Sequence, residues 1–595
     1  MPQLNSWGPI SFQGVKGLEQ ERDQWATKIG LILAMAGNAV GLGNFVRFPT
    51  QVAQNGGGAF MVPYFLALFL LGIPIMWVEW VAGRYGGKYG HGTLGPTYYL
   101  MARESLNPRG ALVMGVISGM VAFAGVTLLN SYYLHLIGWS AAYTWFSITG
   151  AYFGKNTGQF FSDYLNNHAE VLVFWGITIV TIAIAVGRGV SKGIEKWVKV
   201  MMPLLYIFAI IMVGYVFVLG SPIKPDWSTI DGFSFIWTPN WAYLKEHFAA
   251  VMLAASGQIF FTLSLGMGII QNYASYLGPN DDVALSGIAT VSLNEFAEVV
   301  LGGSLAIPLA TAYFTKIINP GIVMSAFTKL NNGKLIQVDK GALIQLGVPL
   351  NVINKALSTG NPTILKSYIV AHWSSIMAAF NVHKDVGLQA IGRTFGLGFA
   401  YTALPNAFVS MGQAGRFFGA LWFLLLWFAG WTSAIAMYNY LVALFEEDLG
   451  IRRGVGTWLV LLIYFFLGLP VVYIGLDNYV TPLDNWISFQ LTLLALLDII
   501  VAVYLFRPSN FWDELHKGAY VKIPTFYKWI TLIVAPIFLL IPLFGTFKGF
   551  ISGGIPKTVG AVIITMFIIG AIETYFAIKR KYGEEIKKNK VLVKV

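Results

Sequence analysis

The sequence is dominated by long apolar segments that contain few or no charged residues. A helix needs about 20 mostly apolar residues to cross the roughly 30 Å of hydrocarbon in a bilayer. Segments of this kind with no Asp, Glu, Lys or Arg are residues 110–148, 171–187, 200–223, 248–280, 417–445, 454–476 and 529–547. Others, some with one or two ionisable side chains, are residues 29–46, 57–83, 283–314, 486–506 and 558–578. They predict an all-α membrane protein with about twelve transmembrane helices, because strands of a membrane barrel would be short and alternating.

The composition excludes several other classes of protein. Only 11% of the 595 residues are charged, whereas a soluble domain has about 25%, so the polar side chains are too few to cover a soluble enzyme. The absence of cysteine excludes disulfides, thiol nucleophiles and cysteine-ligated metal sites. The sequence also contains no catalytic triad, nucleotide-binding loop or metalloprotease motif. We therefore predict that the chain is not an enzyme.

The net charge of +11 is explained by orientation in the membrane. With the N-terminus in the cytoplasm, 24 of the 39 Lys and Arg residues lie on the cytoplasmic side, and 8 of the others lie in residues 316–393. Short cytoplasmic loops are enriched in Lys and Arg, whereas long loops are largely exempt from this rule. We expect a multi-pass protein of the cell membrane with both termini in the cytoplasm, in contact with the lipid bilayer and with no nucleic-acid partner.

Two apolar segments have residues that disfavour a helix in their middle. Residues 37–44 include three glycines and two asparagines, and residues 261–268 include Ser264, Gly266 and Gly268. Small residues also allow close packing of membrane helices, and this explanation stays open for each segment alone. Two such segments five spans apart are typical of inverted-repeat transporters. Their discontinuous helices offer carbonyls to cations and positive helix ends to anionic groups.

The same segments resemble the neurotransmitter:sodium symporter family, and most closely its bacterial leucine-transporter-type members. The residues that carry this resemblance are 25–49, 257–266, the run Asn55-Gly56-Gly57-Gly58-Ala59-Phe60 and the run Leu293-Asn294-Glu295. The resemblance covers nearly the whole chain except residues 317–386. It implies a LeuT-type fold, which is a 5+5 inverted repeat with helices one and six unwound at mid-membrane.

The resemblance also implies how the chain is organised. The expected parts are a cytoplasmic N-terminal segment (1–24), a first repeat with spans one to five (25–223), an external loop (224–247), a second repeat with spans six to ten (248–506), spans eleven and twelve (507–580) and a basic cytoplasmic tail (581–595). The second repeat includes an enlarged external loop (315–416), in which residues 317–386 depart from the family. Stabilisation, contact within a homo-oligomer and simple loop growth are the alternative explanations for this insertion.

Two sodium ions are implied by the resemblance. Helices one, six and seven hold the first ion in the family, and the matching residues are Ala39, Asn44, Thr262 and Asn294. Helices one and eight hold the second ion, and the matching residues are Gly37, Val40, Ala429, Thr432 and Ser433. Oxygen ligands suit a hard cation. Hydroxyls such as those of Thr432 and Ser433 also bond within their own helix, which is the alternative explanation for them.

The substrate is implied to lie at the two breaks, against helices three and eight. The matching residues are Asn38, Ala39, Leu42, Gly43, Leu129, Tyr133, Phe261, Thr262, Ser264, Met267, Ser433 and Met437. Monoamine-transporting relatives have an aspartate at the position of Gly41, so the substrate here is expected to bring its own carboxylate, as an α-amino acid does. Met267 and Met437 adapt to varied shapes, which predicts a neutral, hydrophobic or aromatic amino acid. Leu129 is expected to disfavour substrates with the largest side chains.

Charged pairs are implied as gates at the two ends of the path. Arg47 matches the outer arginine of the family, and its expected partner is Asp484, with Asp477 as a less favoured alternative. The residues that match the inner gate are Arg22, Glu447, Tyr276 and Ser275. For each charged residue, a solvated loop end is the alternative explanation.

Two acidic residues within predicted spans are candidates for a task in transport. Glu298 follows Asn294 by one helical turn, so both lie on one face of the helix. Chloride-dependent relatives have a small polar residue here. The carboxylate of Glu298 is therefore expected to replace chloride and make transport chloride-independent, with protonation on the return step as a further hypothesis. Glu79 is expected either to balance the charge of sodium or to support the site structurally.

Together these features predict sodium-coupled symport of an amino acid by alternating access. The alternatives are coupling to protons or to exchange of another solute, and a sensor that binds an amino acid without moving it. A channel would need a continuous pore lined by repeated polar rings, and the sequence contains no such repeat.

Overall fold

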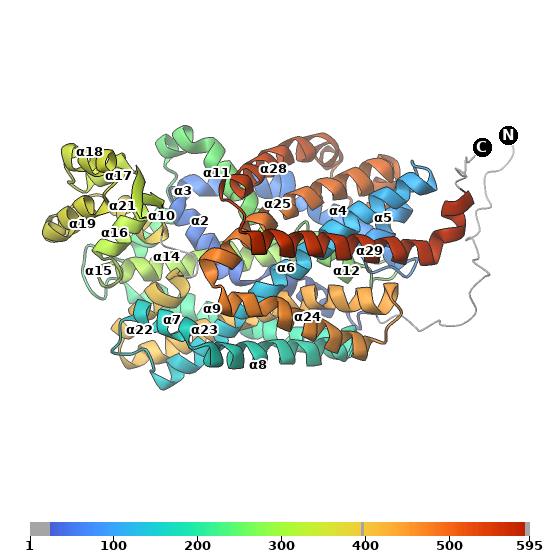
Figure 1. The fold of residues 1–595 in the computed structure, drawn as a ribbon, viewed down its shortest axis with the longest axis horizontal. Coiled ribbons are helices and arrows are strands. Elements are labelled where there is room, and N and C mark those ends of the chain that lie inside the picture. Colours follow the sequence, from blue (N-terminus) through green and yellow to red (C-terminus); the bar gives the residue numbers. More distant parts are fainter. Residues whose placement is uncertain (1–23, 332, 394–397, 589–595) are drawn as a thin grey trace.

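The computed structural model describes residues 24–331, 333–393 and 398–588, and this part of the chain is an all-α membrane protein. Ten of its helical segments are long and apolar enough to cross a membrane. They are α3–α4 (Gly58–Gly87), α6 (Pro108–Thr149), α8 (His168–Gly187), η3–α9 (Val190–Leu219), α13–α14 (Val283–Ala312), α23–η6 (Gln413–Asp448), α24 (Arg453–Tyr473), η7–α25–η8 (Leu476–Leu505), α27–α28 (Phe526–Ser552) and α29 (Lys557–Lys588). Most run along the long axis of the molecule (Figure 1).

An eleventh span is a bent pair of helices. The helix α1 (Lys28–Ala39) and the segment η1–α2 (Gly43–Gln54) meet at a break with a bend of 47°. The predicted sixth span is likewise divided, into α11 (Trp241–Thr262) and α12 (Ile269–Ala274). Counting α11 and α12 as a further span would give the expected number, and twelve stays a prediction.

Local sequence explains where these helices begin and end, and α6 is the clearest case. The side chain of Asn107 accepts a hydrogen bond from the backbone N–H of Gly110 at 2.8 Å and so caps the first turn. Gly150 ends the helix in the left-handed conformation with φ of 74°, which glycine adopts without steric cost. The 42 residues give a length of about 63 Å at 1.5 Å per residue. This helix is about twice as long as the hydrocarbon is thick, so it tilts or projects.

Shorter elements connect the spans. The helices are α5 (Leu94–Ala102), α7 (Thr157–Asn166), α10 (Thr229–Trp237), α22 (Leu404–Ser410) and α26 (Pro508–His516), and η5 (Phe399–Ala403) is a π-helical turn. The region expected as an external loop (224–247) is largely helical, because it contains α10 and the first turns of α11. Ser228 begins α10 with a capping box, in which its side chain and that of Asp231 each bond the other's backbone N–H.

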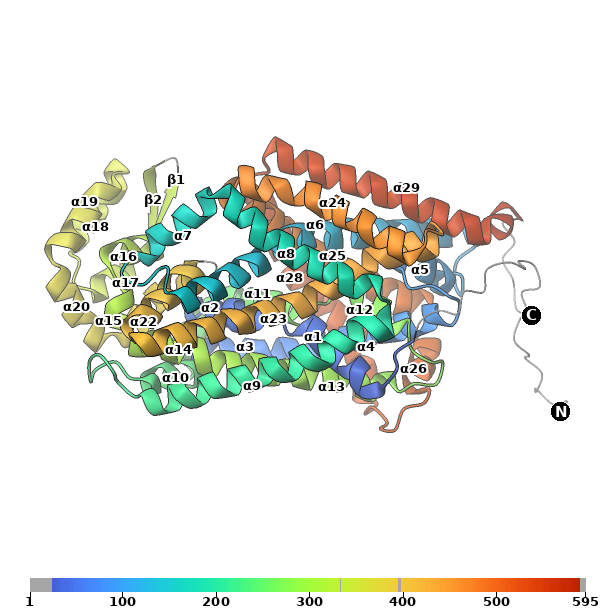
Figure 2. The same cartoon turned by 90° about the horizontal axis from the view of Figure 1, so that it is seen from below.

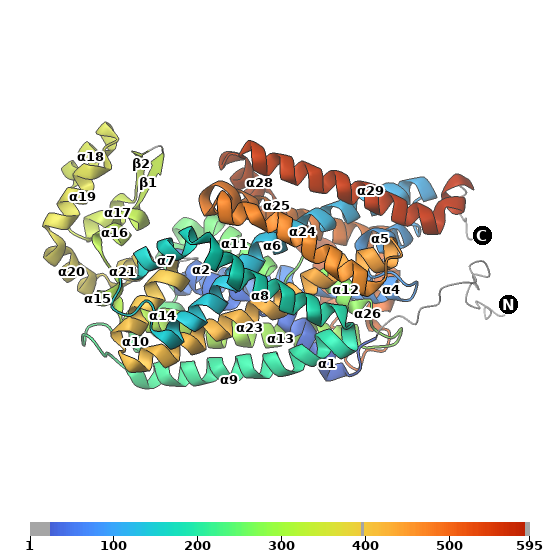
Figure 3. The same ribbon diagram turned by 60° about the horizontal axis from the view of Figure 1, so that its bottom comes forward.

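The insertion forms a group of short elements at one end of the molecule. Its elements, with the helices that flank it, are α15 (Phe314–Ile317), α16 (Pro320–Phe327), β1 (Thr328–Asn331), β2 (Lys334–Val338), α17 (Lys340–Gln345), α18 (Leu350–Thr359), α19 (Pro362–Ala371), α20 (Trp373–Val382) and α21 (Lys384–Arg393). The strands pair antiparallel, with Thr328 opposite Val338. This group lies at the end opposite to the last turns of α29 (Figures 1 and 3). The helices α9 and α29 lie on opposite sides of the bundle (Figure 2).

The end of the insertion is docked on the second half of the first span. A side chain added at Gly392 on α21 would place its Cβ 2.2 Å from Ala53 Cβ on α2 (Phe48–Gln54). The side-chain amide of Gln54 donates a hydrogen bond to the backbone carbonyl of Gly392 at 3.2 Å. Only glycine permits this close approach, so α2 and α21 are held together at the end that carries the insertion.

The two breaks lie against each other. The hydroxyl of Ser264 donates a hydrogen bond to the backbone carbonyl of Asn38 at 2.9 Å. Ser264, Gly266 and Gly268 have positive φ angles of 56°, 69° and 79°, so the chain between α11 and α12 is not helical. The carboxylate of Glu79 accepts a hydrogen bond from the backbone N–H of Gly266 at 2.7 Å. Glu79 therefore supports the break in the sixth span directly.

Candidate functional site

A cavity of about 350 Å³ lies at the two breaks, and its lining extends to Gln54 on α2, the helix on which the end of the insertion is docked. Ten of the twelve expected substrate contacts line it, namely Ala39, Leu42, Gly43, Leu129, Tyr133, Phe261, Ser264, Met267, Ser433 and Met437. The other two, Asn38 and Thr262, are buried behind the wall. The volume is within the range of small-molecule sites, about 300–1,000 Å³.

The wall of the cavity is apolar on one side and offers a few polar groups on the other. Leu129, Met267 and Met437 supply apolar surface. The hydroxyl oxygen of Tyr133 accepts a hydrogen bond from the backbone N–H of Leu42 at 3.0 Å, so it is anchored on the break in the first span. A Cβ at Gly41 would lie only 2.7 Å from this oxygen, so a side chain at position 41 would displace Tyr133.

Oxygen atoms from three spans converge beside the cavity. The side-chain amide nitrogen of Asn44 lies 3.1 Å from Thr262 Oγ1, 2.8 Å from Asn294 Oδ1 and 3.0 Å from Glu298 Oε2. The side-chain oxygen Oδ1 of Asn44 accepts a hydrogen bond from the backbone N–H of Gly41 at 2.8 Å. A positively polarised amide group therefore sits among hydroxyl, amide and carboxylate oxygens. This donor set fits a hard cation such as sodium. Ala39, the fourth residue expected at this ion, lines the cavity at the same break.

Glu298 is the centre of this buried network. Besides Asn44, its carboxylate accepts hydrogen bonds from Gln258 Nε2 at 2.8 Å, from the Tyr64 hydroxyl at 3.0 Å and from the Thr262 hydroxyl. The carboxylate is fully buried. The Glu298 carboxyl group, with several donors around it, therefore lies directly beside the oxygen cluster.

The residues expected at the second ion are also neighbours. A Cβ at Gly37 on α1 would lie 3.1 Å from Thr432 Cβ on α23 (Gln413–Ala443), so the two helices touch here. The hydroxyl of Thr432 donates hydrogen bonds to the carbonyls of Phe428 at 2.9 Å and Ala429 at 3.2 Å. In this arrangement Thr432 bonds within its own helix, which is the alternative considered for it above. Val40 is buried at the break, and Ser433 lines the cavity beside Gly41.

The expected outer gate is brought together but not joined. Arg47 and Asp484 both line the cavity. Arg47 donates a hydrogen bond to Gln258 Oε1 at 2.6 Å and lies 4.2 Å from the ring centre of Phe261. Asp484 accepts a hydrogen bond from the Tyr132 hydroxyl at 2.8 Å. Within the described residues these two charged groups form no ion pair with each other. Asp477 is exposed and lies outside the cavity, which favours Asp484 as the gate residue.

Several contacts hold the first span at the opposite end. The indole N–H of Trp25 donates to the carbonyl of Tyr273 at 3.1 Å, and the two rings pack edge to face. The carboxylate of Glu195 accepts hydrogen bonds from the Ala26 N–H at 2.7 Å and the Thr27 hydroxyl at 2.8 Å, and it pairs with Lys199 at 2.6 Å. These contacts fix the start of α1 on η3–α9.

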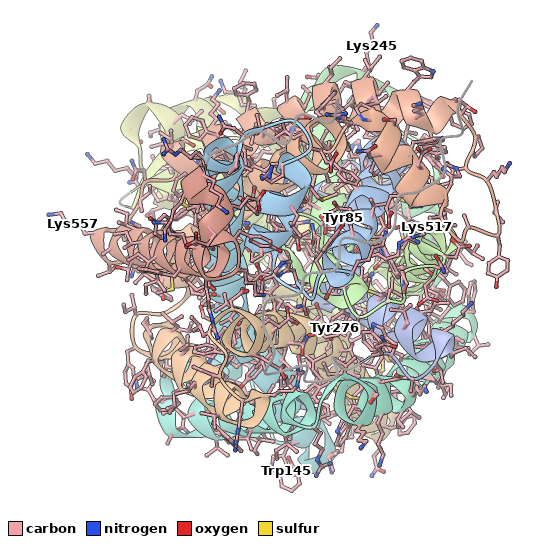
Figure 4. The ribbon with its side chains drawn as sticks, turned by 90° about the vertical axis from the view of Figure 1, so that its right-hand side faces the viewer. Tyr85, Trp145, Lys245, Tyr276, Lys517 and Lys557 are labelled. Carbon is pink, nitrogen blue, oxygen red and sulfur yellow. The ribbon has the colours of Figure 1, made fainter. Side chains whose placement is uncertain are left out.

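Three of the four residues expected at the inner gate lie in the described part of the chain. Arg22 lies outside the described residues. Glu447 accepts a hydrogen bond from the backbone N–H of Gly92 at 2.5 Å, and the Ser275 hydroxyl donates to the carbonyl of Asn272 at 2.5 Å. Tyr276 is buried near the centre of the bundle seen from this end (Figure 4).

Several residues of the site were not assigned from the sequence. They are Tyr64, Tyr132, Gln258 and Glu195. Gln258 lies one helical turn before Thr262, as Glu298 lies one turn after Asn294, so the spacing of four residues could have indicated it. For Tyr132 and Glu195 the sequence holds no comparable signal, because their partners lie far away in the chain.

Comparisons with known proteins show the family to which the chain is related. A family model described as the sodium:neurotransmitter symporter family matches residues 22–163 and 150–552. An uncharacterized sodium-dependent transporter of Methanocaldococcus jannaschii is 27% identical over 571 residues, which is 93% of this chain and 95% of that protein. The sodium-dependent neutral amino acid transporter SLC6A17 of Rattus norvegicus is 23% identical over 550 residues, which is 87% of this chain and 72% of that protein.

A solved structure shares the fold. The crystal structure of MhsT in complex with L-phenylalanine matches with a TM-score of 0.64 and 24% identity, over 88% of this chain and 99% of that chain. MhsT is a LeuT-fold transporter, so the match confirms the LeuT-type fold expected from the sequence.

Proposed function

Because this chain belongs to the sodium:neurotransmitter symporter family, and is therefore a membrane transporter and not an enzyme, we propose that it carries a neutral, hydrophobic or aromatic amino acid across the cell membrane together with sodium. The observation that carries this proposal is the cavity at the two helix breaks, which lies beside a cluster of oxygen atoms. Supporting it, one relative is named as a neutral amino acid transporter and MhsT was solved with L-phenylalanine.

The substrate binds with its carboxylate at the polar side of the cavity. The Tyr133 hydroxyl and the backbone at the two breaks are the groups available to a carboxylate there. Its side chain faces Leu129, Met267 and Met437, whose surfaces are apolar and, for the methionines, adaptable. Since Gly41 has no carboxylate and no room for one, an amine without its own carboxylate is not held.

Two sodium ions accompany the substrate. The first binds at Ala39, Asn44, Thr262 and Asn294, whose oxygens are supported by the charge of Glu298. The second binds between α1 and α23, at the residue set Gly37, Val40, Ala429, Thr432 and Ser433. Because the Thr432 hydroxyl donates to its own helix, its oxygen lone pairs remain available to a cation. Glu298 makes chloride unnecessary.

Transport proceeds by alternating access. The end that carries the insertion faces outside, and both termini are cytoplasmic. Arg47 and Asp484 close the outer end after the substrate binds, and the contacts of Trp25 and Glu195 then open at the inner end. Sodium and substrate bind at the same breaks and therefore cross together. The inward sodium gradient then drives uptake of the substrate.

Uptake into proteoliposomes tests this function. Radiolabelled leucine, phenylalanine, tryptophan, glutamate and a monoamine would be offered with and without an inward sodium gradient. We expect accumulation of the neutral amino acids only with sodium. Uptake driven by a proton gradient or by internal solute would instead support proton coupling or exchange, and binding without uptake would indicate a sensor.

A further inference from the structure

The two charged groups of the outer gate are each held by a neutral partner. Arg47 is bonded to Gln258 and stacked on Phe261, whereas Asp484 is bonded to Tyr132. Both charged residues line the same cavity. Closing the outer end by pairing Arg47 with Asp484 therefore requires an exchange of partners, in which Asp484 leaves the Tyr132 hydroxyl.

Tyr132 is placed for this contact by its position on α6. Consecutive residues of a helix point about 100° apart, and Tyr132 and Tyr133 accordingly serve different walls of the cavity. The Tyr133 hydroxyl contacts the break in the first span, and the Tyr132 hydroxyl contacts α25 (Thr481–Asp498) near its start. Tyr132 is only 3% exposed, so its ring is fixed by packing and its hydroxyl has a defined position.

Resting on the proposed function, we propose that Tyr132 is a positioning residue that holds Asp484 away from Arg47 and so stabilises the open form of the outer end. A hydrogen bond from a hydroxyl to a carboxylate is among the stronger ones in proteins. In the open form, this bond gives the partly buried carboxylate of Asp484 a hydrogen-bond donor. Without it, the nearest compensation for the charge of Asp484 is Arg47, and the closed form becomes favoured.

The test measures the population of open and closed forms without substrate. The chain has no cysteine, so two introduced cysteines are the only labelling sites. Val382→Cys and Asp477→Cys are suitable positions for spin labels, because both native residues are exposed, Val382 at the end of α20 in the insertion and Asp477 in η7 before α25. Distance distributions between the labels then report opening directly in the full chain.

The substitution is Tyr132→Phe, which removes only the hydroxyl. We expect the ratio of open to closed populations to fall by about tenfold or more. The matched control is Tyr401→Phe, which removes a hydroxyl that also lines the cavity but bonds Ser140 and the carbonyl of Leu136 instead. The control should leave the distances unchanged.

A second variant distinguishes the positioning of Asp484 by Tyr132 from a general loss of packing around Tyr132. In an Asp484→Asn variant, Tyr132→Phe should have no further effect on the distances. An unchanged distribution in Tyr132→Phe, or an equal shift in the Asp484→Asn background, would overturn the proposal. Because the distances are measured without substrate or a gradient, a failure of sodium-coupled uptake would contradict the proposed function and leave this test unaffected.

Discussion

Replacement of Glu298 by serine should convert the protein into one that requires chloride. The Glu298 carboxylate lies 3.0 Å from the Asn44 amide and accepts hydrogen bonds from Gln258, Tyr64 and Thr262. Serine removes the negative charge and leaves space among the same donors. A chloride ion in this space would restore the charge and accept their hydrogen bonds.

The size of the effect follows from the dimensions of the cluster. The contacts around the Asn44 amide are 2.8–3.1 Å long, which sets the scale of the separation between a bound sodium ion and the carboxylate. At about 4 Å and an effective dielectric constant near 20, their attraction is about 4 kcal/mol. Sodium affinity without chloride should therefore fall by about 100- to 1,000-fold.

Uptake into proteoliposomes in chloride and in gluconate measures this effect. Wild-type uptake should be equal in both anions, whereas Glu298→Ser should be active only with chloride. The matched control is Glu295→Gln, which removes a neighbouring carboxylate that contacts Tyr64 and Asn294 but not Asn44. Its uptake should not respond to chloride. Chloride stimulation of the wild type, or equal activity of Glu298→Ser in both anions, would refute the reasoning.

Three further predictions concern other parts of the molecule. Gly41→Ala should weaken substrate binding by at least about tenfold, because its Cβ would lie 2.7 Å from the Tyr133 hydroxyl oxygen; equilibrium binding of labelled substrate checks this. Thr432→Val should raise the sodium concentration for half-maximal uptake, and unchanged sodium dependence would contradict the second ion site. Burial raises the pKa of Asp231, but hydrogen bonds from Lys384 and its own helix cap lower it more, to below the ordinary 3.8. The resulting stabilisation is present above about pH 4 and lost as the pH falls further. Asp231→Asn should therefore lower the free energy of unfolding at pH 7 by no more than about 1 kcal/mol, seen as a slightly lower thermal midpoint, and should have no effect near pH 2.

The spans could be predicted because the bilayer imposes one simple requirement on length and polarity. The segment 110–148 corresponds to α6, and 454–476 corresponds to α24, with ends that differ by a few residues. The difference arises because caps such as Asn107 act outside the apolar run. The glycines and asparagines at residues 37–44 and the glycines at residues 261–268 likewise indicate where regular helix ends.

Side-chain partners at the site could not be predicted in the same way. Asp484 and Tyr132 are 352 residues apart, so their contact depends on the packing of α6 against α25. The hydrogen bond from the Thr432 hydroxyl to its own helix depends on the rotamer of the side chain, which the sequence does not determine. The resemblance to a family supplied the identities of the site residues, and the fold brings ten of the twelve expected substrate contacts to one cavity.

The start of α1 has a consequence for leakage. Glu195 holds the Ala26 N–H, the Thr27 hydroxyl and Lys199 at once, and Trp25 holds the carbonyl of Tyr273. Hydrogen bonds to charged groups contribute about 1.5–3 kcal/mol each, and the contacts of Trp25, Ala26 and Thr27 must break together because these residues are consecutive. We expect a sodium ion alone to open this end rarely, so that little of the gradient is dissipated without cargo. Turnover should also slow steeply on cooling.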